Sequence, residues 1–411
     1  MDFTPSAKSQ QLLQKLEQFF DDYIYPNEAQ YAHQLHDAEN RFAALPLMDE
    51  LKTKARAAGL WNLFVPPSHA EYCDHGGLSF SDYAPLAELM GRVQWSPEVF
   101  NCNAPDTGNI EVLMNFGTAA QKDRWLTPLL NGEIRSSYAM TEPQVASSDA
   151  TNIELRIERD GDEWVLNGRK WFITGAMYER TKIFIVMGKS DPDNPNRHQQ
   201  QTQVLVPKDT AGLEIIRPLT TLGYDDAPIG HAELVFNNVR VPAENVLLGE
   251  GRGFEIAQSR LGPGRMHHCM RLIGAAQRAL ELACQRAVAR TTFGRPLSKH
   301  QSVREDISKS FSEVEMARLL VLKTCDKIDR EGVAESIDMI AATKTTVPLL
   351  VQKLIDRCMQ LHGAGGLTED YFMAEAFNYA RWCRQADGPD QVHQMALGKK
   401  IIDRYSGQES R

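Results

Sequence analysis

The order of hydrophobic patterns along the chain constrains its fold more than any other feature. Apolar residues recur at helical spacing through the first third, strand-like runs with turn signals fill 153–247, and long helical stretches follow Gly253. A Rossmann chain would instead alternate strands with helices from its start. The order predicts an α+β fold of three domains, helical over 1–136, β over 137–249 and helical over 250–411.

Turn residues and hydrophobic spacing predict the individual elements. Asp160-Gly161 and Asn167-Gly168 are strong hairpin signals between strand-like runs. The expected helices cover 12–23, 48–58, 81–90, 119–130, 266–290, 301–330, 334–361 and 391–402. The expected strands cover 163–166, 182–187, 203–206, 213–216 and 232–236.

Composition and charge argue against several classes of protein. Hydrophobic residues make up 42% of the 411 residues and the net charge is −9, so we expect a sizeable core and no nucleic-acid partner. The seven scattered cysteines contain no CxxC pair, which argues against a disulfide framework and against a metal site. No signal core, transit segment or apolar run of about 20 residues is visible, so we expect a cytoplasmic chain without a transmembrane segment.

The glycine-rich motifs of common nucleotide-binding folds are absent. Neither GxGxxG nor GxxxxGK[ST] occurs in the sequence. A cofactor would therefore need another kind of site. The junction at 138–149 supplies hydroxyls and free backbone N–H groups for one, or it is only a linker. In 169–174, one of two adjacent aromatics could flank a planar ring while the other packs in the core, or both could pack in the core.

Two further segments carry side chains suited to a ligand. Arg290, at the expected end of a long helix, could bind a phosphate or simply lie in solvent. Asp390 could cap the last helix. Asp387 has no such obvious local task, and the neighbouring Gly388 would let the backbone approach a ligand closely.

Six motifs in order resemble those of the acyl-CoA dehydrogenase family, and in particular the branch that contains mammalian members ten and eleven and their bacterial relatives. Each motif is weak alone, but the six in order are specific and span nearly the whole chain. They are FGTAAQKDRWLTPLLNGE at 116–133, YAMTEPQVASSDAT at 138–151, GRKWFITGA at 168–176, RTTFGRPLSKHQ at 290–301, QLHGAGGL at 360–367 and ADGPDQVH at 386–393. The resemblance implies FAD as cofactor, together with N-terminal helices, a middle antiparallel β-barrel domain and a C-terminal four-helix bundle.

The resemblance also implies which residues contact the cofactor. Thr141 matches a residue that hydrogen-bonds the flavin near N5, and Phe172 takes the position of a flavin-packing tryptophan, with Thr174 as its polar companion. The loop here is one residue longer than the usual TEPGAGSD, so either Ser147 or Ser148 could be the serine near cofactor and substrate. The implied contacts within one subunit are Tyr138, Met140, Thr141, Ser147, Ser148, Phe172, Thr174, Pro389, Asp390 and Gln391.

A second group matches residues that reach the FAD of a neighbouring subunit, so the resemblance implies a homodimer or homotetramer. This group consists of Arg290, Phe293, Gln360, Gly363 and Ala364.

Asp387 stands where the family commonly has a catalytic glutamate followed by glycine. Some relatives carry the base on the helix near Arg265, but the matching residue here is Gly264. Asp387 is therefore the implied base, with a reach roughly 1.5 Å shorter than that of glutamate and with a pKa that we expect burial to raise. The implied substrate contacts are Ser148, Arg265 and Gly388.

The implied reaction is FAD-dependent α,β-dehydrogenation of an acyl-CoA thioester to the trans-2-enoyl-CoA. Asp387 takes the α proton, flavin N5 takes the β hydride, and an electron-transferring flavoprotein accepts the electrons. The branch suggests long, branched, 4-hydroxy or 4-phospho acyl chains. A local basic group would suit an added phosphate, or it is only a helix surface; it comprises Arg265, His267, His268 and Arg271.

Two alternatives remain open. The first is a flavin-dependent oxidase of the same superfamily, acting on an acyl-CoA or on a nitroalkane. The second is a nucleic-acid-associated relative without metabolic turnover, for which the acidic composition is poorly suited.

Overall fold

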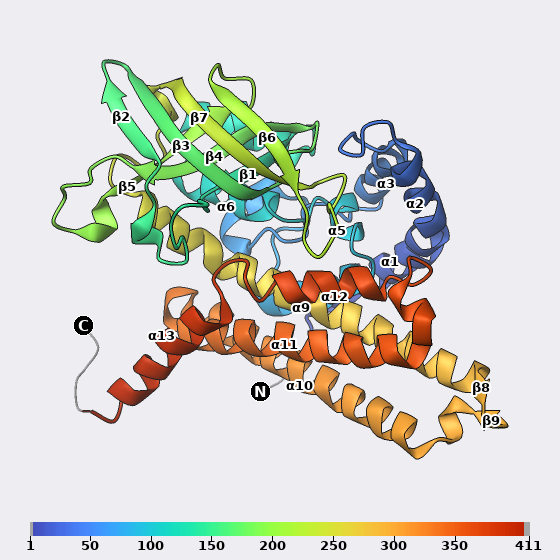
Figure 1. Ribbon diagram of the computed structural model, residues 1–411. Helices are drawn as coiled ribbons and strands as arrows, with labels where there is room; N and C mark the ends of the chain where they lie inside the picture. The colour runs from blue at the N-terminus through green and yellow to red at the C-terminus, as the bar shows by residue number, and fades with distance from the viewer. Residues whose placement is uncertain (1–2, 407–411) are drawn as a thin grey trace.

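The computed structural model describes residues 3–406 as an N-terminal set of helices, a β-sheet and a C-terminal group of long helices (Figure 1). The sheet lies on one side of the molecule, the long helices lie on the other, and the N-terminal helices lie beside both (Figure 1). This arrangement confirms the predicted α+β fold class. Within residues 3–406, no helix is both long enough and apolar enough to cross a membrane.

The N-terminal part differs from expectation where one helix was predicted over 119–130. That stretch consists of α7 (Ala119–Gln121), a π-helical turn (Lys122–Leu126) and α8 (Thr127–Leu130). Pro128 lacks the N–H that would continue regular α-helical bonding, so the ladder changes there. The other helices of this part are α1 (Ala7–Phe19), α2 (Glu28–Asp37), α3 (Pro46–Ala57), α4 (Phe80–Met90), α5 (Ser96–Val99) and α6 (Asp106–Phe116).

Seven strands form one sheet in the order β1-β4-β2-β3-β7-β6, with β5 paired to β4. Most neighbours are antiparallel, but β1 and β2 both lie parallel to β4. The Asp160-Gly161 hairpin joins two strands as predicted. The strands are β1 (Arg135–Ala139), β2 (Arg156–Asp160), β3 (Glu163–Thr174), β4 (Thr181–Lys189), β5 (Gln201–Pro207), β6 (Leu213–Leu219) and β7 (His231–Pro242).

The predicted hairpin turn at Asn167-Gly168 is wrong. β3 continues through this dipeptide, and its register against β7 shifts between Leu166 and Gly168. A Cβ at Gly168 would lie 3.0 Å from Leu155, so the glycine permits a close approach inside a β-bulge.

The C-terminal helices surround α9 (Gly253–Ala289), which begins well before its expected start at Met266. Pro263 lies inside this helix, so the Gly262-Pro263-Gly264 run does not interrupt it. A small hairpin of β8 (Thr291–Thr292) and β9 (Arg295–Pro296) connects α9 to the next helix. The remaining helices are α10 (Gln301–Glu331), α11 (Ile337–His362), α12 (Met373–Trp382) and α13 (Asp390–Asp403).

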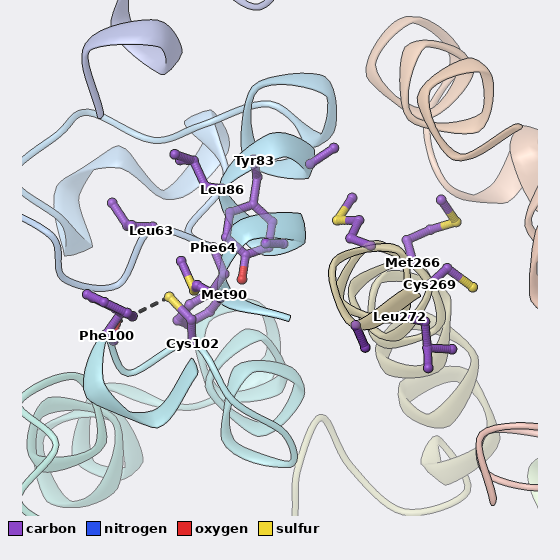
Figure 2. Packing of buried hydrophobic residues seen from close by; sticks show 14 of the residues in the cluster. Leu63, Phe64, Tyr83, Leu86, Met90, Phe100, Cys102, Met266, Cys269 and Leu272 are labelled. Atoms are coloured by element: carbon purple, nitrogen blue, oxygen red, sulfur yellow. Dashed lines mark hydrogen bonds between the residues drawn. The ribbon is translucent and has the colours of Figure 1, made fainter. Parts of the chain in front are cut away.

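α4 crosses α9 at close range, which fixes the middle of α9 in the molecule. A Cβ at Gly274 would lie 1.8 Å from the Glu88 carbonyl oxygen, and one at Gly91 would lie 1.9 Å from the Arg271 carbonyl oxygen. Buried apolar side chains of the N-terminal helices and of α9 form one cluster around this contact (Figure 2). Only glycine allows the two backbones to come so near.

Candidate active site

Asp387 lies in the loop between α12 and α13, against α9. Its φ is 56°, a left-handed conformation uncommon for a residue with a side chain. Arg265 of α9 donates from Nε to the Asp387 carbonyl oxygen at 2.9 Å, and His393 Nε2 lies 3.1 Å from the same oxygen. Gly388 follows with a φ of 103°, and a Cβ there would lie 2.8 Å from His393 Nε2. α9 and α13 therefore hold this loop in one shape.

The carboxylate of Asp387 is 17% exposed, and its Oδ2 lies 3.7 Å from His268 Nε2. Burial raises the pKa of Asp387, but three nearby cationic side chains lower it to below the usual value. The cationic side chains are those of Arg260, Arg265 and Lys344. The expected raised pKa is therefore wrong for the free chain, and the carboxylate is ionised at neutral pH.

The two positions at which the sequence resemblance implies a base, Gly264 and Asp387, lie side by side. A Cβ added to Gly264 would lie 3.6 Å from Asp387 Oδ2, which is an ordinary contact distance. A carboxyl side chain could therefore reach the same point from α9 or from the loop before α13. In this chain only Asp387 supplies one.

The local basic group is not the helix surface considered from the sequence. His267, His268 and Arg271 are 3%, 7% and 6% exposed, because other elements cover α9 over residues 266–276. Burial lowers the pKa of both histidines to about 3, so they are neutral at pH 7 and add no charge for a phosphate. Arg271 donates from Nη1 to the Cys102 carbonyl oxygen at 3.0 Å.

A cavity of about 450 Å³ lies between α9 and the N-terminal helices. Gly262 and Arg265 contribute to its α9 wall, and Tyr83 of α4 and Glu111 of α6 contribute to the opposite wall. Burial raises the pKa of Glu111 to about 8, although Arg260 lowers it in part. The cavity therefore presents a neutral carboxyl group at pH 7, in a size range typical of small-molecule sites.

The loop that follows β1 is fixed by a buried ion pair. Lys170 donates from Nζ to the Met140 carbonyl oxygen at 2.7 Å and to the Glu142 carboxylate at 2.8 Å. Burial lowers the pKa of Lys170 to about 8. The neighbouring Thr141 is exposed, so its hydroxyl is accessible to a ligand, while Lys170 fixes the shape of the loop.

Tyr138 is a residue of β1, just before this loop. Its hydroxyl accepts a hydrogen bond from Gln203 Nε2 at 2.8 Å, and the Arg260 guanidinium lies 4.1 Å from the ring centroid. Burial raises the pKa of Tyr138 to about 12, and the charge of Asp387 adds to that increase. The β1 loop and the α12–α13 loop therefore share one electrostatic environment.

The two candidate serines of the loop have different surroundings. Ser147 Oγ accepts a hydrogen bond from the Glu142 N–H at 2.8 Å, so this side chain folds back onto the loop. Ser148 is exposed. The arrangement favours Ser148 as the serine that meets a ligand.

The adjacent aromatics at the end of β3 do not pack in the core. Phe172 is 41% exposed with a φ of 52°, and Trp171, 5.0 Å away between ring centroids, is half-buried. The alternative in which both rings pack in the core is therefore wrong, because a register shift between Lys170 and Ile173 interrupts the alternation of faces. Thr174 Oγ1 lies 3.0 Å from His231 Nδ1.

Asp390 does not cap α13. It is the first helical residue, and its Oδ2 accepts from Arg384 Nε at 2.7 Å, while the preceding Pro389 occupies the cap position. Among the described residues, Asp390 Oδ1 is buried without a hydrogen-bond partner. Gln391 is exposed.

The residues present are chemically suited to FAD. The unpaired Asp390 Oδ1, the exposed Thr141 hydroxyl and the exposed Phe172 ring suit a planar ligand with polar edges.

The residues matched to a neighbour's cofactor lie elsewhere, beside the β8–β9 hairpin and at the adjoining end of α11 (Figure 1). Arg290 is more than 20 residues along the chain from His268, roughly 30 Å of helix. Phe293 is 95% exposed with a φ of 50°. Gln360, Gly363 and Ala364 are also exposed. A single chain does not bring this group to Asp387.

Three residues near the site were missed from the sequence. Glu111 lines the cavity, Lys170 anchors the β1 loop, and His231 bonds Thr174 while its Nε2 lies 2.7 Å from Asp226 Oδ2. Each gains its position from tertiary packing. Lys170 lies inside the GRKWFITGA motif, but none of the six motifs contains Glu111 or His231.

Comparison with known proteins agrees with the architecture. Models of the acyl-CoA dehydrogenase N-terminal, middle and C-terminal domains match residues 6–133, 137–239 and 251–402. A solved structure from Mycobacterium abscessus is 46% identical with a TM-score of 0.94, over 98% of this chain and 100% of that chain. Butyryl-CoA dehydrogenase from Megasphaera elsdenii is 26% identical with a TM-score of 0.82, over the same shares.

Curated relatives extend over nearly the whole chain. Acyl-CoA dehydrogenase family member 10 of Mus musculus is 50% identical over 98% of this chain and 37% of its own length. Acyl-CoA dehydrogenase family member 11 of Gallus gallus is 48% identical over 98% of this chain and 51% of its own length. The chain thus spans about half of one relative and 37% of the other, whereas it covers 98% of the 46% identical "Probable acyl-CoA dehydrogenase FadE2" of Mycobacterium tuberculosis. The chain belongs to the acyl-CoA dehydrogenase family, whose cofactor is FAD.

Proposed function

We propose that the chain catalyses FAD-dependent α,β-dehydrogenation of an acyl-CoA thioester, with Asp387 as the base that removes the α proton. One observation carries this proposal: a single ionised carboxylate stands at the point where both family positions for the base converge. The adjacent cavity shares Arg265 with the loop that holds this carboxylate. A base of this kind must be ionised before substrate binds, and the low pKa of Asp387 satisfies that requirement.

The chain's own groups then have separate tasks. FAD, when bound, supplies the acceptor for the two electrons removed from the substrate. Thr141, Phe172, Thr174 and Asp390 would hold it, and Ser148 would contact cofactor and substrate. Asp387 Oδ2 takes the α proton, and its backbone N–H donates to the thioester oxygen, where negative charge develops.

The side chains that line the cavity limit which acyl chains it can bind. Its wall carries Glu111, whose neutral carboxyl group at pH 7 can donate a hydrogen bond to an oxygen on the chain. Among long, branched, 4-hydroxy and 4-phospho chains, we therefore propose a chain that carries a hydroxyl group.

The proposal is tested by adding acyl-CoAs to the purified FAD-loaded protein without oxygen. Acyl-CoA should bleach the flavin absorption band, and Asp387→Asn should retain FAD but lose more than about a hundredfold in the rate of bleaching. Near-normal bleaching in that variant would remove Asp387 as the base. Equal rates with hydroxylated and plain chains of the same length would remove the preference for a hydroxyl group.

The electron acceptor separates the dehydrogenase from the oxidase. We propose an electron-transferring flavoprotein as acceptor, so turnover should require a protein or dye acceptor and release little peroxide. Peroxide formed in proportion to turnover, with oxygen alone, would instead identify an acyl-CoA or nitroalkane oxidase. Binding to DNA that weakens with salt would point to the nucleic-acid-associated alternative, which the net charge of −9 disfavours.

We also propose that the active species is a homodimer or homotetramer. Phe293, with 95% of its side chain exposed, would be costly to leave in water and suits burial against a second copy. Arg290, Gln360, Gly363 and Ala364 would then complete the neighbour's FAD site.

A further inference from the structure

His268 is a buried side chain of α9 that lies directly beside the proposed base. Its Nε2 is 3.7 Å from Asp387 Oδ2, and its Nδ1 is 2.9 Å from the Tyr379 hydroxyl of α12. The ring also packs edge-on against Trp382, with centroids 5.6 Å apart and planes at 78°. The imidazole is therefore held between α12 and the loop that carries Asp387.

The neighbours of His268 determine which ring nitrogen carries the proton. Arg271 Nη2 lies 3.4 Å from His268 Nδ1, and a guanidinium can only donate hydrogen bonds. Arg271 also hydrogen-bonds the Tyr379 side chain, which leaves the Tyr379 hydroxyl proton free to point at Nδ1. Nδ1 is thus an acceptor from both neighbours. The proton of the neutral imidazole must then be on Nε2, the atom that faces Asp387.

The imidazole remains neutral in this environment. Burial lowers the pKa of His268 to about 3, and the charge of Arg271 adds to that decrease. Other charged or titratable groups face the pair from every packed element: Arg260 and Arg265 on α9, Lys344 on α11, Cys383 after α12 and His393 on α13. The cationic members of this set favour the ionised form of Asp387 and oppose a second positive charge on His268.

We propose that His268 is the positioning residue of the catalytic base: its Nε2–H faces the Asp387 carboxylate at 3.7 Å, and this neutral dipole favours one orientation and the ionised form of that carboxylate. This inference rests on the function proposed above. Aspartate is shorter than the usual glutamate, so its carboxylate must be held closer to one place, and a donor at its back does this without adding charge. Tyr379 and Arg271 maintain the required tautomer from the other side of the ring.

The test compares His268→Gln, which keeps an N–H donor, with His268→Leu, which removes it. For the free enzyme, the acid limb of kcat/KM against pH should move up by about one pH unit in His268→Leu and by much less in His268→Gln. A purely structural role would lower kcat/KM at all pH values without moving the limb. An unmoved limb in His268→Leu, or equal shifts in both variants, would overturn the proposal.

A second measurement does not depend on turnover. In protein labelled with ¹⁵N-histidine, the His268 signals, identified by their loss in His268→Gln, should report a neutral ring protonated at Nε2 at pH 7. Tyr379→Phe should weaken that preference, which serves as the check if His268→Leu fails to fold. A ring protonated at Nδ1, or a charged ring, would overturn the proposal. Full activity in Asp387→Asn would instead contradict the function itself.

Discussion

Two parts of α9 lie beside residues that we propose for catalysis and FAD binding, and the two parts differ in how far the same chain covers them. Near Gly264 and His268, the helix is covered by α4, α11 and α12, and the side chains of Arg265 and His268 lie within hydrogen-bond distance of other parts of the same chain. Near Arg290, the helix ends at a hairpin whose Phe293 is 95% exposed. Folding of one chain is therefore sufficient to position the proposed base. The residues near Arg290 would contribute to a FAD site only when a second copy of the chain packs against them.

The largest expected effect concerns the buried end. Asp387→Gly should reduce the rate of flavin reduction by acyl-CoA about 10²- to 10⁴-fold, the usual contribution of a positioned base. Adding Gly264→Glu in the same chain should restore part of that rate, because the Gly264 Cβ position lies 3.6 Å from Asp387 Oδ2. Anaerobic stopped-flow absorbance measures both. Gly264→Glu in the otherwise unchanged protein is the control, and no recovery in the double variant would contradict convergence of the two positions.

The next effect concerns the crossing that holds this end in place. Gly274→Ala would bring its Cβ 1.8 Å from the Glu88 carbonyl oxygen, so α4 and α9 must separate. We expect a loss of about 1–3 kcal/mol in the free energy of unfolding, measured by denaturant titration. Gly398→Ala is the matched control, because nothing lies within 4 Å of its Cβ position on α13 and alanine favours the helix. Equal stability of the two variants would show that the crossing does not set the packing.

Elements with a strong local pattern could be predicted from the sequence, whereas elements that depend on tertiary contacts could not. Helices such as α10 and α11 have long apolar periods, and their ends lie within a few residues of those expected. The start of α9 was missed because Gly262-Pro263-Gly264 resembles a break, while tertiary packing keeps it helical. β1 and α12 were missed because both are short and gain their stability from neighbours.

The residues of the candidate site could be located from the sequence more readily than their surroundings. Asp387 and its loop were identified because a motif resembles that of a known family, and a motif gives the position of a residue in the chain but not the charges around it. The direction of the Asp387 pKa shift was wrong because it depends on Arg260, Arg265 and Lys344, which are distant in sequence. Glu111 had no motif around it at all.

A smaller effect is expected at the exposed end. Phe293→Ser should weaken FAD retention and self-association about tenfold, since a large aromatic side chain at an interface often contributes more than 1 kcal/mol. Fluorescence titration of the apoprotein with FAD and light scattering measure the two effects. Tyr405→Ser, at a side chain 89% exposed beyond α13, is the control. If Phe293→Ser changes neither quantity, the proposed role of the exposed end is wrong.

The smallest effect separates the two serines of the β1 loop. Ser147→Ala removes the oxygen that accepts the Glu142 N–H at 2.8 Å, so it should lower the free energy of unfolding by about 1 kcal/mol. Ser148→Ala, at an exposed side chain, should change stability by less than about 0.5 kcal/mol but weaken FAD binding several-fold. Denaturant and FAD titrations of both variants give the answer. Weaker FAD binding in Ser147→Ala, with a stability loss in Ser148→Ala, would contradict this assignment. Ser147 would then be the serine that contacts the cofactor, and its hydroxyl would turn away from Glu142 when FAD binds.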